Sequence, residues 1–108
     1  MDNLTEILAR HADLDGGRAA MSDNRQSLSR ADLARWVAGA AADLAQGPET
    51  IGIFGENGVE WAIAFLAASA AGKTVVPVPA FFSKEQCAHL ISDAGIKYVL
   101  DVSTGETA

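Results

Sequence analysis

Two glycine-containing segments are the first candidates for phosphate chemistry. Residues 52–58 read Gly-Ile-Phe-Gly-Glu-Asn-Gly between a predicted strand and a predicted helix, where a dinucleotide-binding loop would lie. The spacing is G-x-x-G-x-x-G rather than G-x-G-x-x-G, and Glu56 would place a negative charge beside a pyrophosphate. No acidic residue closes the next predicted strand, which ends Val78-Pro79-Ala80, to hold a ribose. A plain strand-to-helix turn is therefore the favoured interpretation.

Residues 71–74, Ala-Gly-Lys-Thr, match the end of the phosphate-loop pattern G-x-x-x-x-G-K-[ST]. The first glycine of that pattern would fall at residue 67, which is Ala67. The pattern also needs a strand that leads into a helix, so that backbone N–H groups face the phosphate, whereas here a predicted helix leads into a predicted strand. Gly72 is therefore expected to end a helix, and Lys73 to be a cation near a helix C-terminus.

No set of reacting side chains is apparent elsewhere. His11 and His89 are the only histidines, and neither stands at a metal-ligand spacing to Cys87. Cys87 falls on the apolar face of a predicted helix, where a thiol is more often a core residue than a nucleophile. Trp36 and Trp61 also fall on apolar helical faces and should pack in the core. The sequence therefore predicts no catalytic residue, no cofactor-binding residue and no metal ligand.

The elements that would position such groups begin with a helix and a hairpin. Leu4, Ile7, Leu8 and His11 share one helical face, with Asn3 as N-cap, and the helix should end before the two glycines at 16–17. Residues 18–22 and 26–29 are short extended candidates. They flank a polar trio suited to a turn, Asp23, Asn24 and Arg25.

Ser29 is the expected N-cap of a second helix, which Gly47 and Pro48 should stop. Its apolar stripe is Leu33, Trp36, Val37, Ala40, Ala41 and Leu44. Residues 50–55 then read as a buried strand, followed by a helix with Asn57 as N-cap and Glu60 at the capping-box position. That helix is apolar nearly all round, so it should be buried on more than one side.

The remaining pattern is strand, helix, strand. Residues 74–78 form the next expected strand, which Pro77 pushes toward a sheet edge or a strand end. Ser83 and Gln86 form a capping box for a helix that should bury Cys87, Leu90, Ile91 and Ala94 and stop at Gly95. Residues 96–102 supply the last strand. The fold class is therefore α/β, a three-layer βαβαβ unit with a parallel sheet, preceded by a helix, a short hairpin and a second helix.

Composition excludes several classes of partner. Hydrophobic residues make up 49% and charged residues 20% of the 108, which is the balance of one packed domain. A net charge of -6 disfavours nucleic acid and anionic membranes. The single cysteine and the absence of a basic, apolar leader fit a reducing cytoplasm. The longest apolar run, residues 61–72, is shorter than the roughly 20 residues of a transmembrane helix.

The order of motifs from residue 56 onward resembles the N-terminal subdomain of the acyl-adenylate-forming superfamily, and most closely an AMP-forming acyl-CoA synthetase. Those enzymes have an asparagine before Glu-Trp, an apolar helix that ends Ala-Gly, and a strand with Val-Pro. The matching residues are Asn57, Glu60, Trp61, Phe65, Ala71, Gly72 and Pro77. Residues 27–33 more loosely resemble the threonine-tyrosine-x-glutamate-leucine opening of a helix, with Ser29 in the place of the threonine. Residues 83–100 are similar to the segment in which a helix ends at glycine and enters a strand.

The resemblance implies a parent AMP-binding ligase that uses ATP, Mg²⁺ and coenzyme A, with a carboxylic acid as substrate, as in fatty acid metabolism. The family's phosphate loop, ribose and magnesium ligands and catalytic lysine would lie beyond residue 108. Residues 1–102 would then be an N-terminal subdomain fragment, inactive alone, and 103–108 a truncated linker. The partner of this fragment would be the rest of the large domain, and the fragment would form one side of that domain.

Two other readings remain open. One is a free-standing α/β module that binds a small ligand or a partner protein near Gly55, Glu56, Asn57, Pro79 and Ala80, where the strands end. The other is a non-catalytic assembly element that self-associates through exposed sheet edges. Both predict a stable, soluble 108-residue protein, whereas the fragment interpretation predicts marginal stability or self-association, and no ATP binding measurable by calorimetry.

Overall fold

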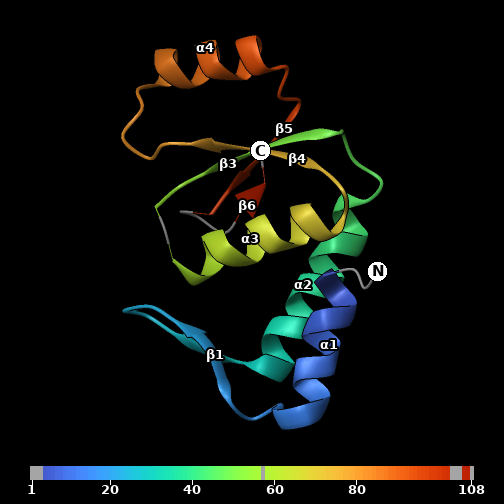
Figure 1. Ribbon diagram of the computed structural model, residues 1–108. Coiled ribbons are helices and arrows are strands. Elements are labelled where there is room, and N and C mark those ends of the chain that lie inside the picture. The colour runs from blue at the N-terminus through green and yellow to red at the C-terminus, as the bar shows by residue number, and fades with distance from the viewer. Residues whose placement is uncertain (1–3, 57, 103–105, 108) are drawn as a thin grey trace.

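A four-stranded sheet, parallel except for its last strand, has one helix on its first face and three helices on its second side (Figure 1). The computed structural model describes residues 4–56, 58–102 and 106–107. In chain order the elements are α1 (Leu4–Asp15), β1 (Ala19–Ser22), β2 (Ser27–Ser29), α2 (Arg30–Leu44), β3 (Thr50–Phe54), α3 (Val59–Ala70), β4 (Thr74–Val78), α4 (Lys84–Ala94), β5 (Tyr98–Asp101) and β6 (Glu106–Thr107).

The sheet has the strand order β4-β3-β5-β6. Strand β3 pairs in parallel with both β4 and β5, so that Ile51 lies opposite Val75 on one side and Tyr98 on the other. This arrangement confirms the α/β class and the parallel βαβαβ unit. Pro77 lies on β4, an edge strand, as its missing N–H required. Strand β6 pairs antiparallel with β5, so two residues of the expected linker form a strand.

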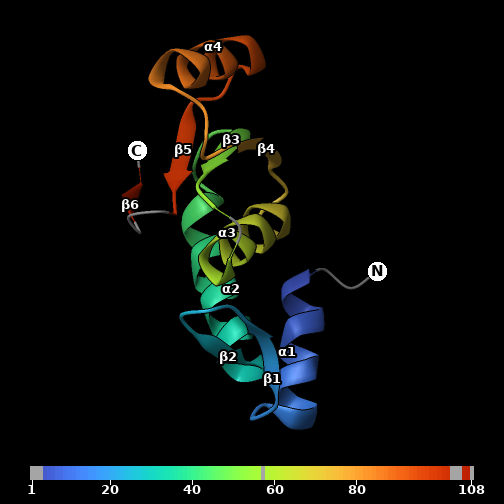
Figure 2. The same ribbon diagram turned by 90° about the vertical axis from the view of Figure 1, so that its left-hand side faces the viewer.

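The N-terminal half also follows the sequence expectations. The hairpin β1–β2 is antiparallel, and α2 begins where the Ser29 hydroxyl accepts the Asp32 backbone N–H at 3.1 Å. Asn3, the expected N-cap of α1, lies outside the described residues. Helix α1 packs mainly against α2 and lies farther from the sheet, whereas the C-terminal part of α2 lies beside α3 and reaches the sheet (Figure 2).

The core is concentrated on the α3 face of the sheet. Its main cluster joins β3, α2 and α3 through Ala41, Leu44, Ile51, Ala67 and Ala68. The buried residues of α3 are Val59 and three alanines, whereas Trp61 is half-buried and Phe65 is 41% exposed. The expectation that α3 is buried on more than one side therefore holds for its small residues, which face α2 and the sheet, and fails for its aromatic edge.

Helix α4 covers the other face less completely than the sequence predicted. Its capping box is present, since Ser83 Oγ accepts the Gln86 N–H and the Gln86 side chain accepts the Ser83 N–H. None of its residues is fully buried, however, and Ala94 is exposed rather than part of a buried face. The helix packs on the edge strand β4 without a second helix beside it, so its apolar side stays half-open.

Candidate functional site

One cleft opens where β3 and β4 end, at the carboxyl edge of the parallel strands. It has a volume of about 510 Å³. Its lining consists of Gly55, Glu56, Trp61, Pro77, Val78, Pro79, Ala80 and Phe81. The structure thus brings together Gly55, Glu56, Pro79 and Ala80, the strand-end residues that the sequence pointed to. Asn57 lies outside the described residues.

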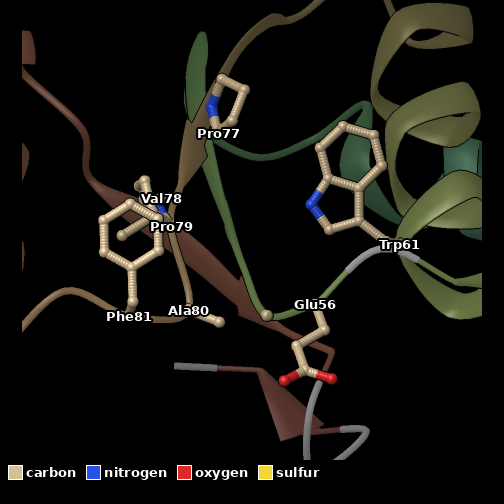
Figure 3. A pocket seen from close by; sticks show the side chains of 8 residues that line it. Glu56, Trp61, Pro77, Val78, Pro79, Ala80 and Phe81 are labelled. Carbon is tan, nitrogen blue, oxygen red and sulfur yellow. The ribbon is translucent and has the colours of Figure 1, made fainter.

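Aromatic rings stand on both sides of this cleft. Figure 3 shows the Trp61 indole projecting from α3 on one side and the Phe81 ring from the chain after β4 on the other. The Trp61 ring stacks on Phe65, with centroids 5.6 Å apart and an interplanar angle of 12°. Phe81 is 84% exposed and meets Phe82 edge to face. The walls can therefore accept a flat or apolar group, and the Glu56 carboxylate points away from them (Figure 3).

A second cleft, of about 540 Å³, lies between the hairpin tip and the strand ends. Its lining combines polar residues, Asp23, Asn24, Arg25, Glu56 and Glu60, with the apolar residues Phe54, Ala80 and Val102. Glu56 and Ala80 line both clefts, so the two share a wall.

Asp23 ties the hairpin tip to the start of α3. Its Oδ2 accepts the Val59 backbone N–H at 2.8 Å, and its Oδ1 accepts the backbone N–H groups of Arg25 at 2.8 Å and Gln26 at 3.0 Å. These hydrogen bonds, that of Val59 first, lower the pKa of the Asp23 carboxyl below its ordinary value. Arg25 Nη2 also lies 3.1 Å from Glu60 Oε2.

Sequence reasoning missed this contact. It treated Asp23 and Arg25 as turn residues only and placed the cap of α3 at Asn57, with Glu60 as its box partner. The N-cap position is instead Gly58, which has no capping side chain, and Glu60 pairs with Arg25. No sequence signal identifies this contact, because Asp23 and Val59 are 36 positions apart and Asn57 offers a local cap residue.

The glycines of residues 52–58 have packing roles. A Cβ at Gly52 would lie 3.2 Å from Ile96 Cγ2 and 3.3 Å from Val78 Cγ2, so the side chains around β3 fill that space. Gly55 has φ of 138°, which L side chains rarely adopt. The filled space at Gly52 favours the plain turn over a dinucleotide loop, whose glycines leave room for the pyrophosphate.

The other residues that the sequence singled out are dispersed. Gly72 ends α3 at φ of 75°, and Lys73 Nζ donates to the carbonyl oxygens of Gly47 at 3.0 Å and Ala45 at 3.4 Å, just beyond the C-terminal end of α2. His89 pairs with Asp93 on the exposed side of α4, and Cys87, on the same helix, is half-buried. Across the described residues, no group of three or more His, Cys, Asp or Glu side chains gathers where it could hold a metal.

An apolar groove of about 450 Å³ runs between α2, α3 and β5. Trp36, 45% exposed, forms part of its wall together with Ile63, Tyr98 and Leu100. The expectation that Trp36 packs in the core is therefore wrong within this chain. Among the described helices, none is long and apolar enough to cross a membrane.

Comparison with known proteins identifies one family. The family described as AMP-binding enzyme matches residues 8–108. Among curated proteins, no match is found.

Solved structures share the fold. The N-terminal subdomain of Klebsiella oxytoca NpsA has a TM-score of 0.75 at 21% identity, over 94% of this chain and 28% of that one. The nonribosomal peptide synthetase FmoA3, bound to alpha-methyl-L-serine-AMP, has a TM-score of 0.80 at 24% identity, over 93% of this chain and 12% of that one. Coronafacic acid ligase of Pectobacterium brasiliense, an R395G mutant, has a TM-score of 0.79 at 20% identity, over 93% and 21%. This chain therefore spans less than a third of each.

Proposed function

The chain belongs to the AMP-binding enzyme family, and we propose that it forms the N-terminal layer of a larger ATP-dependent ligase that activates a carboxylic acid as its adenylate. The family match over residues 8–108 carries this proposal. The fold that this chain shares with NpsA and FmoA3, over only part of their lengths, supports it.

In the proposed reaction, a carboxylate oxygen attacks the α-phosphorus of ATP and pyrophosphate leaves. A thiol then attacks the acyl carbon and AMP leaves, which gives a thioester. We assign no residue of this chain to either step. The resemblance to the acyl-adenylate-forming superfamily supports assigning the Mg²⁺ ligands to other parts of the enzyme.

The role assigned to this chain is that of a wall. Its α3 face buries the core cluster, while Trp36, Phe65 and the groove beside Tyr98 remain accessible apolar surface. Exposed aromatic surface of this kind is typical of a subdomain that another part of the same protein covers. The partner is accordingly the remainder of the adenylate-forming domain, and the location proposed is the cytoplasm.

The finer proposal is an acyl-CoA synthetase, with coenzyme A as the thiol and a fatty acid or related acid as substrate. Its support is the sequence resemblance at Asn57, Glu60, Trp61 and Pro77. A carrier-protein thiol is the second candidate, because NpsA and FmoA3 are similar in fold and FmoA3 is a nonribosomal peptide synthetase.

The test uses the protein translated from the complete reading frame that contains these residues. It should exchange labelled pyrophosphate into ATP only when a suitable carboxylic acid is present, across a panel of fatty, aryl and amino acids. Added coenzyme A should then yield acyl-CoA and AMP. Exchange without thioester on coenzyme A, but with thioester on a phosphopantetheinyl carrier protein, would favour the second candidate. No acid-dependent exchange with any acid would overturn the ligase proposal.

A further inference from the structure

The hairpin tip and the N-terminal end of α3 are joined by contacts that the proposed ligase role does not use. Residues 23 and 59 are 36 positions apart, yet Asp23 Oδ2 lies 2.8 Å from the Val59 nitrogen. In Figure 1 the hairpin β1–β2 projects from the α1–α2 layer toward the start of α3. The contact therefore crosses between two parts of the fold that β-pairing does not connect.

We propose that Asp23, at the hairpin tip, acts as a clamp on α3. Its side chain supplies, from a distant segment, the N-terminal cap that Gly58 does not provide. The clamp thereby holds in place the helix that forms one wall of the cleft at the strand ends. The first turn of a helix has free N–H groups and a partial positive charge, both of which a carboxylate satisfies. Helix α3 obtains this carboxylate from the hairpin, whereas α2 and α4 obtain their caps from Ser29 and Ser83, directly before them.

The space at Gly58 fits this role. A Cβ at residue 58 would lie 3.0 Å from Asp23 Oδ2, closer than real Cβ atoms normally approach. A side chain there would push the carboxylate away from Val59. Gly58 thus leaves the space that the Asp23 carboxylate occupies. Two residues farther on, Glu60 adds an exposed ion pair with Arg25.

The charged groups around the clamp come from three segments. Arg25 is on the hairpin, Glu56 follows β3, and Glu60 is on α3, all of them at the same cleft as Asp23. Partial desolvation opposes a negative charge on Asp23, while the three backbone N–H groups and the Arg25 charge favour it. The N–H groups prevail, since the pKa of Asp23 lies below its ordinary value.

Nuclear magnetic resonance on the 108-residue chain tests the clamp. The Val59 amide proton should titrate together with the Asp23 carboxyl carbon, with a midpoint below the ordinary 3.8. The titration should vanish in Asp23→Asn. In Asp23→Ala, hydrogen exchange at Val59 should become at least about tenfold faster, because the amide loses its acceptor.

Two control variants separate the clamp from general loosening. Ser83→Ala should speed exchange at the Gln86 amide and leave Val59 unchanged, because that cap is local. Gly58→Ala should also speed exchange at Val59, though by less than Asp23→Ala, whereas Gly39→Ala, where no atom lies within 4 Å of the added Cβ, should not.

The proposal fails if the Val59 amide does not follow the Asp23 titration, or if its exchange is the same in Asp23→Ala as in the wild type. Should Asp23→Ala lose the signals of α4 as well, the chain has unfolded, and Asp23→Asn and Gly58→Ala decide by the same two readouts. These measurements need no ATP or acid, so they stand or fall independently of the ligase proposal.

Discussion

Helices α3 and α4 each connect two parallel strands of one sheet, but they differ in how they begin and in what they bury. Helix α4 begins with a capping box formed by two residues three positions apart, and none of its side chains is fully buried. Helix α3 receives its cap from Asp23, 36 residues upstream, and buries Val59 and three alanines. The difference teaches that a strong local start signal and deep burial are separate properties of a helix.

The largest expected effect tests the unequal burial of the two sheet faces. Ile51 is fully buried in the α3-side cluster, so Ile51→Ala should lower the free energy of unfolding by about 2–5 kcal/mol. Ile91→Ala, on the half-buried side of α4, should cost only about 1 kcal/mol. Urea unfolding of both variants measures the comparison, and equal losses would show that the two faces are equally packed.

The next effect concerns small residues on the two helices. Ala68 has no exposed surface, so Ala68→Leu should overpack the α2–α3 contact and cost about 1–3 kcal/mol. Ala94 on α4 is exposed, and Ala94→Leu should change the free energy of unfolding by less than about 0.5 kcal/mol. Thermal unfolding of the pair gives the answer. A neutral Ala68→Leu would mean that α3 can move away from α2 without loss.

At their C-terminal ends the two helices should behave alike. Gly72 and Gly95 have φ of 75° and 68°, and each is followed by a residue whose N–H bonds back into the helix. Gly72→Ala and Gly95→Ala should each cost about 1–2 kcal/mol, the penalty of a left-handed alanine. Unfolding in urea should show the two losses within error of each other. A large inequality would contradict the shared ending.

The smallest effect is a difference in pH dependence between the two caps. The pKa of Asp23 is lowered in the folded chain, so its contribution to stability is complete above the ordinary value of 3.8 and is lost as pH falls through the lower folded pKa. The stability difference between wild type and Asp23→Asn should therefore shrink at acid pH. Ser83→Ala should cost about 1 kcal/mol with no such shrinkage, since a hydroxyl does not titrate there. Urea midpoints between pH 2 and 6 distinguish the two, and parallel curves for both variants would refute the contrast.

Local rules explain why much of the fold was predictable. Caps and helix-ending glycines depend only on residues within one helical turn, as at Ser29, Ser83, Gly72 and Gly95. Pro77 lacks an N–H group, so it disfavours a central strand in any sheet. The helices, the parallel βαβαβ unit and the edge position of β4 were therefore correctly predicted.

The parts that failed depend on residues far away in the chain. The half-open face of α4 and the exposed edges of Trp36 and Phe65 reflect which elements pack beside them, which periodicity alone does not specify. The Asp23 contact with Val59 spans 36 residues. The Asp-Asn-Arg sequence is already accounted for as a turn, so it gives no reason to expect a second, distant contact. Of the candidate cleft, the strand-end residues were predicted, whereas Trp61 and Phe81 as its walls were not.

Titration calorimetry of the 108-residue chain with ATP and Mg²⁺ tests the account most directly. If these residues form one side of the proposed ligase and supply no reacting group, the chain should give no saturable heat with ATP and Mg²⁺. Saturable binding of ATP in a ratio of one to one by residues 1–108 alone would contradict the account and favour a self-contained nucleotide-binding module.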